Sequence, residues 1–559
     1  MSFLPELKSL LGVVVGLVGS YCFLVLILSV LAQRSKIVAK RLNGPALLLL
    51  AAISLGAFIA SLAISSSQAI TLRLSDVVSV EPFYLVLESL SWIGLYLDRV
   101  SLIMLAFISF VGLAVSRFAF RYLDGEPQQA RFMSLLGAAI ASGQLLVISG
   151  NLALFALFWI ALSVCFHRLL EHYASRPRAI LAARKKFIIS RLGDLFLLVA
   201  IIALFNKFET LDIQALFAIA KAPLTAEELA TFNLATLGIL GAALCKSAQF
   251  PFHTWLPDTL EAPTPVSALM HAGIVNGGGY ALIRFSPLFT HGELALTLAV
   301  IFGSLTATIG VLVMWSQTNI KKSLAWSTVA QMGFMMLQCG LGAFGLVLMH
   351  ILGHGFYKAH AFMISGTRAQ VLQPQARTES LTAVVAKLLL GVIAAIIVVS
   401  TSANLLGINL STWPGGFVSV VVLVLGLAQM MVPKFEGNSA DFAVRVALLC
   451  LIGFLAVSLE QISTILFASN LASVAPLSSR GGFEFILAIT VVLNFTALGI
   501  FSAILPQLSK TKFGLHFFAH AVNGFYIGLY ADRLIRKLWP QRREGSVSLD
   551  SCNHRTVSS

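Results

Sequence analysis

Three basic side chains recur at four-residue intervals in the segment MHILGHGFYKAHAF, at His350, His354 and Lys358. In a helix this spacing places all three on one face, in a row about two turns long. Each group can bind and release a proton, and ionisable groups in apolar helices usually mark an ion path. Two alternatives remain open: a zinc site, although no Cys or Glu lies near enough to complete its ligand shell, and ordinary packing of the histidines.

A second candidate lies in the segment GAALCKSAQFPFHTWLPDTLEAPTPVSALMHAGIVNGGGY, where Lys246 ends an apolar run. A buried ammonium is costly unless it is paired or neutral, so a buried lysine is suited to exchanging its proton. We therefore predict that Lys246 is a proton relay and that His271 faces the same cavity. The alternative is a Lys246 side chain that extends to the membrane interface.

Other ionisable residues stand at the ends of apolar runs. Arg191 and Asp194 in the segment ARKKFIISRLGDLFLL are three residues apart and can pair, and we interpret the pair as structural. Asp98 and Asp258 stand at span ends, where we expect loop contacts. Glu460, near the end of another apolar run, is a candidate late relay group.

These residues must be positioned by membrane helices, because 58% of the 559 residues are hydrophobic and only 11% are charged. Apolar runs long enough to cross the hydrocarbon core recur along almost the whole chain. We predict an all-α polytopic membrane protein with about fourteen transmembrane helices. The candidate runs are 10–32, 44–64, 98–116, 132–149, 152–170, 188–205, 234–250, 264–286, 294–315, 323–341, 343–366, 383–405, 416–432, 442–460 and 484–505.

The net charge of +14 raises the question of nucleic-acid binding, but the basic residues stand at span ends and not along one solvated face. We interpret them as topology signals. They cluster in three loops, at Arg34, Lys36, Lys40 and Arg41, at Arg117, Arg121 and Arg131, and at Arg176, Arg178, Arg184, Lys185, Lys186 and Arg191. The positive-inside rule then places the N-terminus on the outer side. The six Cys stand singly, without a metal-ligand spacing.

The chain divides by composition into five parts. N-terminal spans occupy 1–97, the core with the candidate relay occupies 98–370, and further spans occupy 371–510. Residues 511–541 mix aromatic and basic side chains and predict an interfacial amphipathic helix. Residues 542–559 are polar and rich in Ser, as in a disordered tail. Within the core, dense prolines predict a broken helix, and broken backbone at membrane depth is tolerated where it lines a site.

The segments KSAQFPFHTWLPDTLEAPTPVSALMHA, SRLGDLFLL, QTNIKKSLAWSTVAQMG and HILGHGFYKAHAF closely resemble motifs of one family. It comprises the proton-conducting antiporter-like subunits of complex I, membrane hydrogenases and Mrp antiporters. The resemblance covers roughly residues 90–370. It implies two inverted repeats of five helices, each with a broken helix. By resemblance, Lys246 is the central lysine of the first half-channel and His271 is the bridging histidine. The row of His350, His354 and Lys358, here called the stripe, is by the same resemblance the relay toward the second half-channel.

The sequence also departs from that family pattern. The family has a Trp-Glu pair in the fifth span, whereas this chain has Trp159 and Ile160. His167 and Glu171, two and three turns further on, are candidate substitutes for the missing acid. The charged residue of the family's twelfth span is likewise absent from VVSTSANLLGINL.

Within this family, the chain is short and has the segment HAGIVNGGGY, which begins at the bridging histidine. With these features it most resembles the DabB-type membrane subunits of the bacterial DAB inorganic carbon pump. That resemblance implies a subunit in the bacterial cell inner membrane that conducts H⁺ or Na⁺. Its expected partner is a large peripheral DabA-type subunit, which binds zinc and resembles carbonic anhydrases. We expect no cofactor in this chain and no enzyme chemistry of its own, because zinc chemistry would belong to the partner.

Other functions remain as alternatives. Within the same superfamily, the chain could serve complex I, a membrane hydrogenase or an Mrp assembly. A quinone-reactive redox module is a different class, although no haem, flavin or cluster motif supports it. A channel that has lost conduction and only anchors its partner is a third class, suggested by the missing acid.

Overall fold

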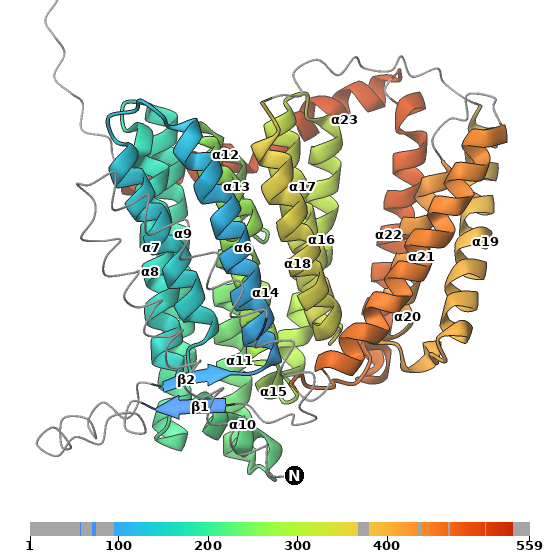
Figure 1. The fold of residues 1–559 in the computed structure, drawn as a ribbon. Helices are drawn as coiled ribbons and strands as arrows, with labels where there is room; N and C mark the ends of the chain where they lie inside the picture. The colour runs from blue at the N-terminus through green and yellow to red at the C-terminus, as the bar shows by residue number, and fades with distance from the viewer. Residues whose placement is uncertain are drawn as a thin grey trace, which may run out of the picture.

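The computed structural model describes residue 56 and residues 70–73, 94–366, 380–432, 439–467, 470–508 and 510–539. Long, roughly parallel helices dominate these residues and form a wide slab (Figure 1). The strands β1 (Ile70–Arg73) and β2 (Gly94–Leu97) form a two-stranded antiparallel sheet at one end of the slab. The fold is therefore all-α in its membrane part, as the apolar runs predict.

The first bundle consists of helices that run up and down between short connections. Its members are α6 (Arg99–Tyr122), α7 (Gln129–Val147), α8 (Leu152–Leu170), α9 (Pro177–Phe208), the short α10 (Ile213–Lys221) and α11 (Ala226–Lys246). Side-chain caps fix several helix starts: Asp98 accepts from Ser101 N at the start of α6, and Asn151 accepts from Ala153 N at the start of α8. The large apolar core lies between these helices and α13–α18.

The helix after α11 is broken, as the prolines predict. α11 ends at Lys246, and the chain continues through η3 (Phe252–Thr254), α12 (Trp255–Asp258) and η4 (Thr259–Glu261). A new helix then crosses the bundle as α13 (Thr264–Ala272), η5 (Ile274–Asn276) and α14 (Gly277–Arg284). Pro263 and Pro265 suit the start of α13, where backbone N–H groups have no helical partner.

Glycines allow the helices around this break to approach closely. A Cβ atom at Gly278 of α14 would collide with the Ala243 carbonyl and the Ser247 hydroxyl of α11. A Cβ at Gly333 would likewise meet the backbone of Ala307. α16 (Glu293–Ser316) and α17 (Ile320–Gly340) are thus packed at short distance, next to α15 (Ser286–Phe289) and α18 (Phe344–Met363).

The C-terminal part forms a second group of long helices at the other side of the slab, coloured orange in Figure 1. Its members are α19 (Leu381–Leu405), η6 (Leu410–Thr412), α20 (Gly416–Ala428), η7 (Gln429–Met431), α21 (Ser439–Phe467), η8 (Leu477–Ser479) and α22 (Gly482–Leu508). α23 (Lys512–Val522), η9 (Gly524–Tyr526) and α24 (Ile527–Leu538) then return across the end of the slab to α9. Figure 1 shows this return at the top.

Ten helices in the described part of the chain are long and apolar enough to span a membrane. The predicted number of about fourteen is not confirmed, because the predicted span 10–32 and, apart from residue 56, the predicted span 44–64 lie outside the described residues. α17, α18 and the short α20 also run within the slab but are not among the ten.

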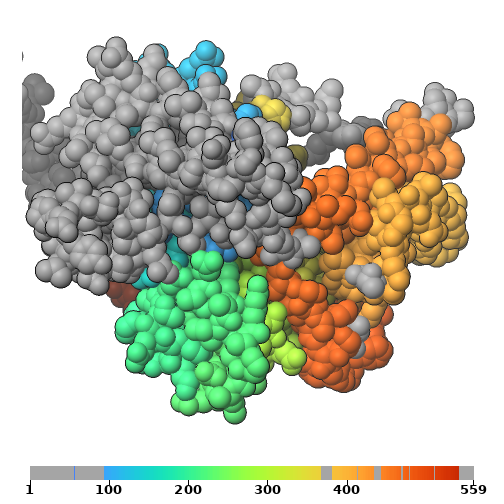
Figure 2. Space-filling view, turned by 60° about the horizontal axis from the view of Figure 1, so that its bottom comes forward, coloured from blue at the N-terminus to red at the C-terminus, as the bar shows by residue number. Residues whose placement is uncertain are grey.

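The two ends of the slab differ in charge. We call the end at which α6 finishes and α9 begins the basic end, because Lys and Arg gather there. Its members include Arg117, Arg121, Arg131, Arg176, Arg178, Arg184, Lys321, Lys322, Arg533, Arg536 and Lys537. Figure 2 shows the opposite end, where α10 and the start of α11 form a green lobe beside the orange C-terminal helices.

Candidate functional site

Lys246 lies at the last position of α11, where the broken helix begins. Its side chain is buried, with 6% of the residue exposed, and does not extend to the interface. The Lys246 Nζ donates to the carbonyl of Trp159 on α8 at 3.0 Å and lies 3.9 Å from the centre of the Trp159 ring. Both contacts are with neutral groups, and no carboxylate of the described residues lies within salt-bridge distance of the ammonium.

The carboxylate that interacts electrostatically with Lys246 belongs to α9. Asp194 interacts electrostatically with Lys246 and Lys186, and its Oδ2 lies 2.9 Å from an Arg191 nitrogen. The Arg191–Asp194 pair that the sequence predicts is therefore present. The structure adds that this pair lies beside the buried lysines and is not confined to the end of a span.

Lys186 is a buried residue that sequence reasoning assigned only to topology. Together with its neighbour Lys185 it is almost inaccessible, at 2% and 0% exposed. The Lys186 Nζ donates to the Ser163 carbonyl at 2.5 Å and to the Ser163 hydroxyl at 2.8 Å. The interpretation of these two lysines as loop charges is wrong, because α9 begins at Pro177 and carries both into the bundle. The available signal was the spacing of Lys186 and Asp194 by eight residues, which places them on one helix face.

The candidate substitutes for the missing acid lie at the end of α8 and directly after it. His167 and Glu171 contact each other at 3.4 Å near the end of this helix, and Arg168 also contacts Glu171. His167 Nδ1 lies 3.3 Å from the Ala183 carbonyl. Position 160 itself is Ile, partly buried against the apolar core. Asp194 is thus the carboxylate that the described structure brings into the electrostatic environment of Lys246.

His271 lies on α13, which packs against α18. It is fully buried, and its ring stacks on Phe362 of α18 with 4.3 Å between ring centres. Neither ring nitrogen has a hydrogen-bond partner among the described protein atoms. Its electrostatic neighbour is Lys358 of α18, so His271 lies beside the second lysine site.

The stripe on α18 lies on one helix face, as its spacing predicts. Lys358 donates to the Leu324 carbonyl at 3.0 Å and to the Ser327 hydroxyl, both on α17. The His350 and His354 ring centres are 5.9 Å apart. His350 Nδ1 lies 2.8 Å from the Gln338 side-chain oxygen, whereas both nitrogens of His354 lack a protein partner within the described residues.

A polar cavity of about 410 Å³ adjoins this stripe. Residues of α17 and α18 line it: Ser327, Gln331, His350, Gly353, His354, Tyr357 and Lys358. A cavity of this size with several polar partners can hold ordered water. Water there would supply the hydrogen bonds that His354 lacks and connect the three basic groups.

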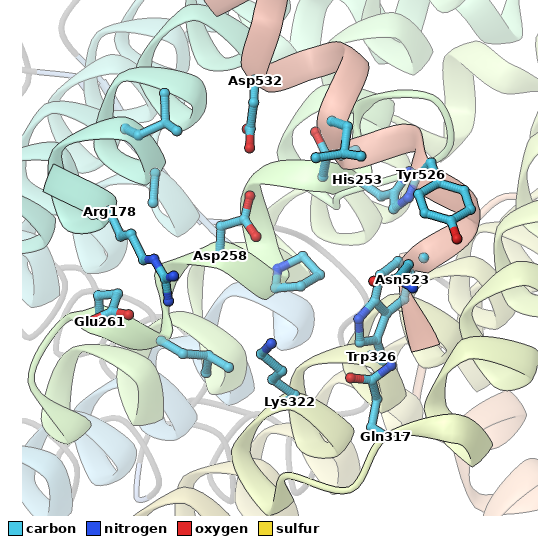
Figure 3. A pocket seen from close by; sticks show the side chains of 18 of the residues that line it. Arg178, His253, Asp258, Glu261, Gln317, Lys322, Trp326, Asn523, Tyr526 and Asp532 are labelled. Carbon is cyan, nitrogen blue, oxygen red and sulfur yellow. The ribbon is translucent and has the colours of Figure 1, made fainter. Parts of the chain in front are cut away.

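A second polar pocket of about 560 Å³ opens at the basic end (Figure 3). Figure 3 shows Asp258 in its middle, with Arg178, Lys322, His253 and Asp532 around it. The buried Lys185 Nζ lies 2.5 Å from Asp258 Oδ2 and also contacts Asp532 of α24. Asp258 is therefore no isolated loop contact, because through Lys185 it helps to hold the C-terminal helix against α9.

His253 lies in the connection between the two halves of the broken helix and lines this pocket. Burial lowers its pKa to about 4, and the positive charge of Lys185 contributes to that shift in the same direction. His253 is therefore neutral at physiological pH. Both of its ring nitrogens lack a protein partner in the part of the chain that the structure describes.

Two further charged sites are buried in the bundle. Asp98 and Arg284 form an ion pair at 2.9 Å near the end opposite the basic end, supported by Tyr280 and Ser101. Asp98 is thus a buried partner and not the loop contact that we expected. Glu460 on α21 is 3% exposed, with Thr464 donating to it at 3.4 Å.

Comparison with known proteins agrees with this arrangement. Residues 149–435 match the family described as NADH:quinone oxidoreductase/Mrp antiporter, TM, and residues 90–133 match the complex I chain 5 N-terminus. Over 472 residues the chain is 37% identical to the probable inorganic carbon transporter subunit DabB2 of Halothiobacillus neapolitanus, covering 82% of this chain and 83% of that one. The chain therefore belongs to the antiporter-like transmembrane family that includes these membrane subunits.

Complex I subunits and solved complexes are also similar. The chain is 39% identical over 273 residues to NADH-quinone oxidoreductase subunit L of Pseudomonas aeruginosa, covering 49% of this chain and 44% of that one. The Mrp complex of Dietzia sp. DQ12-45-1b has the same fold, with a TM-score of 0.52, 22% identity, and 94% of this chain and 57% of that chain covered. These relatives are subunits of larger assemblies, and the present chain is likewise a multi-pass membrane protein.

Proposed function

We propose that this chain is the membrane subunit of an energy-coupled complex for uptake of inorganic carbon, as CO2 or bicarbonate. It conducts H⁺ or Na⁺ through its buried Lys and His residues. The observation that carries the proposal is the set of buried lysines held by neutral acceptors. Lys246 and Lys358 each donate to a backbone carbonyl of a neighbouring helix. The similarity to DabB2 across most of the chain supplies the carbon substrate.

Charge transfer follows from the arrangement of these groups. An ammonium without a salt-bridge partner in a low-dielectric site is destabilised, so it can release its proton and take it up again. In this proposal a proton moves between Lys246 and Lys358 by way of His271. His354 and His350 extend the path along α18, with water in the adjoining cavity as the connection.

The energy available is sufficient for useful coupling. One charge that crosses a potential of about 100 mV releases roughly 2.3 kcal/mol. Because a tenfold change in an equilibrium corresponds to about 1.4 kcal/mol, one coupled charge holds a reaction roughly fiftyfold from its resting ratio. A single proton for each carbon handled is therefore enough to drive accumulation.

The proposed partner is a large peripheral subunit of the DabA type that binds zinc and resembles carbonic anhydrases. This division of labour assigns CO2 hydration to the partner and energy supply to the present chain. The chain itself takes part without a cofactor in this scheme. Its proposed place is the inner membrane of a bacterial cell, with the basic end toward the cytoplasm.

The test uses cells whose growth at ambient CO2 depends on the complex. Lys358→Met keeps the side-chain volume and removes the titratable group, and Lys207→Met changes a lysine at the opposite end, paired with Glu227, as the matched control. We expect the Lys358 variant to lose carbon uptake while the partner still copurifies, and the control to keep it. An uncoupler should abolish uptake by the unmodified complex.

Two results would contradict the proposal. Uptake that survives full collapse of the ion gradient would exclude coupling. Normal growth of the Lys358→Met and Lys246→Met strains would instead favour a membrane anchor without conduction. Zinc analysis of the copurified partner tests the assignment of the hydration chemistry.

The second candidate function is an antiporter-like subunit of complex I, a membrane hydrogenase or an Mrp assembly. It is favoured by the identity of 39% to subunit L of Pseudomonas aeruginosa over about half of this chain. Mass spectrometry of proteins that copurify in mild detergent separates the two functions. A zinc-containing peripheral protein supports carbon uptake, and a set of respiratory or Mrp subunits supports the alternative.

A further inference from the structure

The first half-channel contains one lysine more than the proposed relay uses. Lys186 of α9 is 2% exposed, in the interior of a helix that crosses the bundle. Its Nζ contacts the carbonyl and hydroxyl of Ser163, and no carboxylate lies within salt-bridge distance among the described residues. A group buried in this way is too costly to be a simple topology signal.

The contacts on α8 place Lys186 close to Lys246. Lys246 donates to the carbonyl of Trp159, and Lys186 donates to the carbonyl of Ser163. These two carbonyls are four residues apart and therefore lie slightly more than one helical turn apart, roughly 6 Å along the axis. The two amines are thus stacked on one face of α8, with Lys186 nearer the basic end.

Two ammonium groups at this separation cannot both be charged without cost in a low-dielectric site. The charged or ionisable groups that face Lys186 are Cys165 from α8, Lys246 from α11, and Arg191 and Asp194 from its own helix. Asp194 is already paired with Arg191 at 2.9 Å. The cluster therefore contains one carboxylate, one permanent cation and two lysines that compete for a proton.

We propose that Lys186 is a further proton-carrying residue and that it shares one proton with Lys246 across one turn of α8. The inference rests on the proposed function and adds a step to it. The Nζ–H bond of the Lys186 ammonium breaks, a bond to the neutral Lys246 Nζ forms, and one bridging water passes the proton on. The step moves a proton about one turn between the basic end and the centre of the bundle.

The competing interpretation is that Lys186 is a fixed cation that only stabilises the packing of α8 against α9. A fixed cation is replaceable by Arg, which keeps its charge and does not release a proton in proteins. A proton carrier is replaceable by His, which is smaller but titrates. The two substitutions therefore separate the interpretations, which a single truncation would not.

The experiment measures carbon-dependent proton uptake by proteoliposomes that contain the chain with its copurified partner. We expect Lys186→Met and Lys186→Arg to lower the rate at least tenfold, and Lys186→His to retain a substantial part of it with an altered pH profile. Lys207→Met is the control and should leave the rate unchanged. The double variant Lys186→Met with Lys246→Met should be no slower than Lys246→Met alone, because both act in one path.

Full transport by Lys186→Met or by Lys186→Arg would overturn the inference. If the Met variant does not assemble with the partner, the Arg and His variants decide, since each keeps a polar group in the site. Lys358→Met, measured in parallel, separates the two proposals. Loss of transport there with full transport in Lys186→Arg rejects the role of Lys186 alone, whereas full transport in Lys358→Met rejects the proposed function.

Discussion

The Lys246 site and the Lys358 site each bury a lysine, but the groups around the two lysines differ. In both, a buried lysine donates to a backbone carbonyl of an adjacent helix. Around Lys246 stand a carboxylate, Asp194, and a second buried lysine. Around Lys358 the described neighbours are hydroxyl, amide and imidazole groups. In the proposed path, Asp194 gives the first site a nearby negative charge, whereas the second site relies on water and on proton release.

A third buried cation, Arg284, differs from both lysines because it has a direct carboxylate partner. Arg284 is matched by Asp98 with two direct hydrogen bonds and further support from Ser101. Full pairing fixes the charge in place, because separating the two ions would leave both unsolvated. Among the described residues, Arg284 is thus closely paired, whereas Lys246 and Lys358 have no carboxylate within salt-bridge distance.

The largest expected effect comes from removing either transport lysine. Lys246→Met and Lys358→Met should each reduce carbon uptake to the background level, because a thioether cannot carry a proton. The amount of assembled complex should not fall, since replacing a buried charge by an apolar group of similar size is often neutral or stabilising. Uptake and copurified partner are measured on the same membranes. Strong loss of assembly would show that these lysines are structural.

Removing the partner of the paired cation Arg284 should lower the stability of the protein. Asp98→Ala leaves Arg284 buried without its partner, and breaking a buried pair costs about 3–5 kcal/mol of folding free energy. We expect a clear drop in the melting temperature of the purified protein and little complex in the membrane. Asp98→Asn keeps the shape and some hydrogen bonds and should be milder. An unchanged melting temperature for Asp98→Ala would contradict the distinction between the paired structural charge of Arg284 and the unpaired transport lysines.

An intermediate effect should follow from removing the carboxylate of the first site. Asp194→Asn leaves Arg191 unpaired beside the two lysines, so protonation of either lysine becomes less favourable. We expect carbon uptake to fall about tenfold, which corresponds to roughly 1.4 kcal/mol. Glu171→Gln, at the end of α8, is the matched control and should have little effect. Equal loss in both variants would mean that Asp194 has no special role beside Lys246.

The smallest effect belongs to a surface contact at the basic end. Glu126 accepts hydrogen bonds from His172 and Tyr173, and the bond from His172 is the main cause of its lowered pKa. A lowered carboxylate pKa stabilises the folded state above the ordinary pKa, and this contribution disappears as the pH falls through the folded value. Glu126→Gln should slightly lower the melting temperature at neutral pH and not in acid. A difference that persists in acid would contradict this cause.

The sequence predicted much of the fold because apolar length and proline position are local signals. The break after Lys246 and the stripe on α18 follow from spacing alone, and both are present in the structure. The burial of Lys185 and Lys186 was missed, because the sequence does not show where α9 begins, and only the spacing of Lys186 from Asp194 indicated a shared helix face. The pairing of Asp98 with Arg284 joins residues 186 positions apart, and such contacts are set by packing.

The most direct test of charge transfer through Lys246 measures proton movement itself. Proteoliposomes with the chain and its copurified partner carry a pH dye inside, and an imposed membrane potential drives protons inward in the presence of CO2. We predict acidification with the unmodified chain and none above background with Lys246→Met at equal protein content. Equal acidification in both preparations would show that buried Lys246 does not carry the charge.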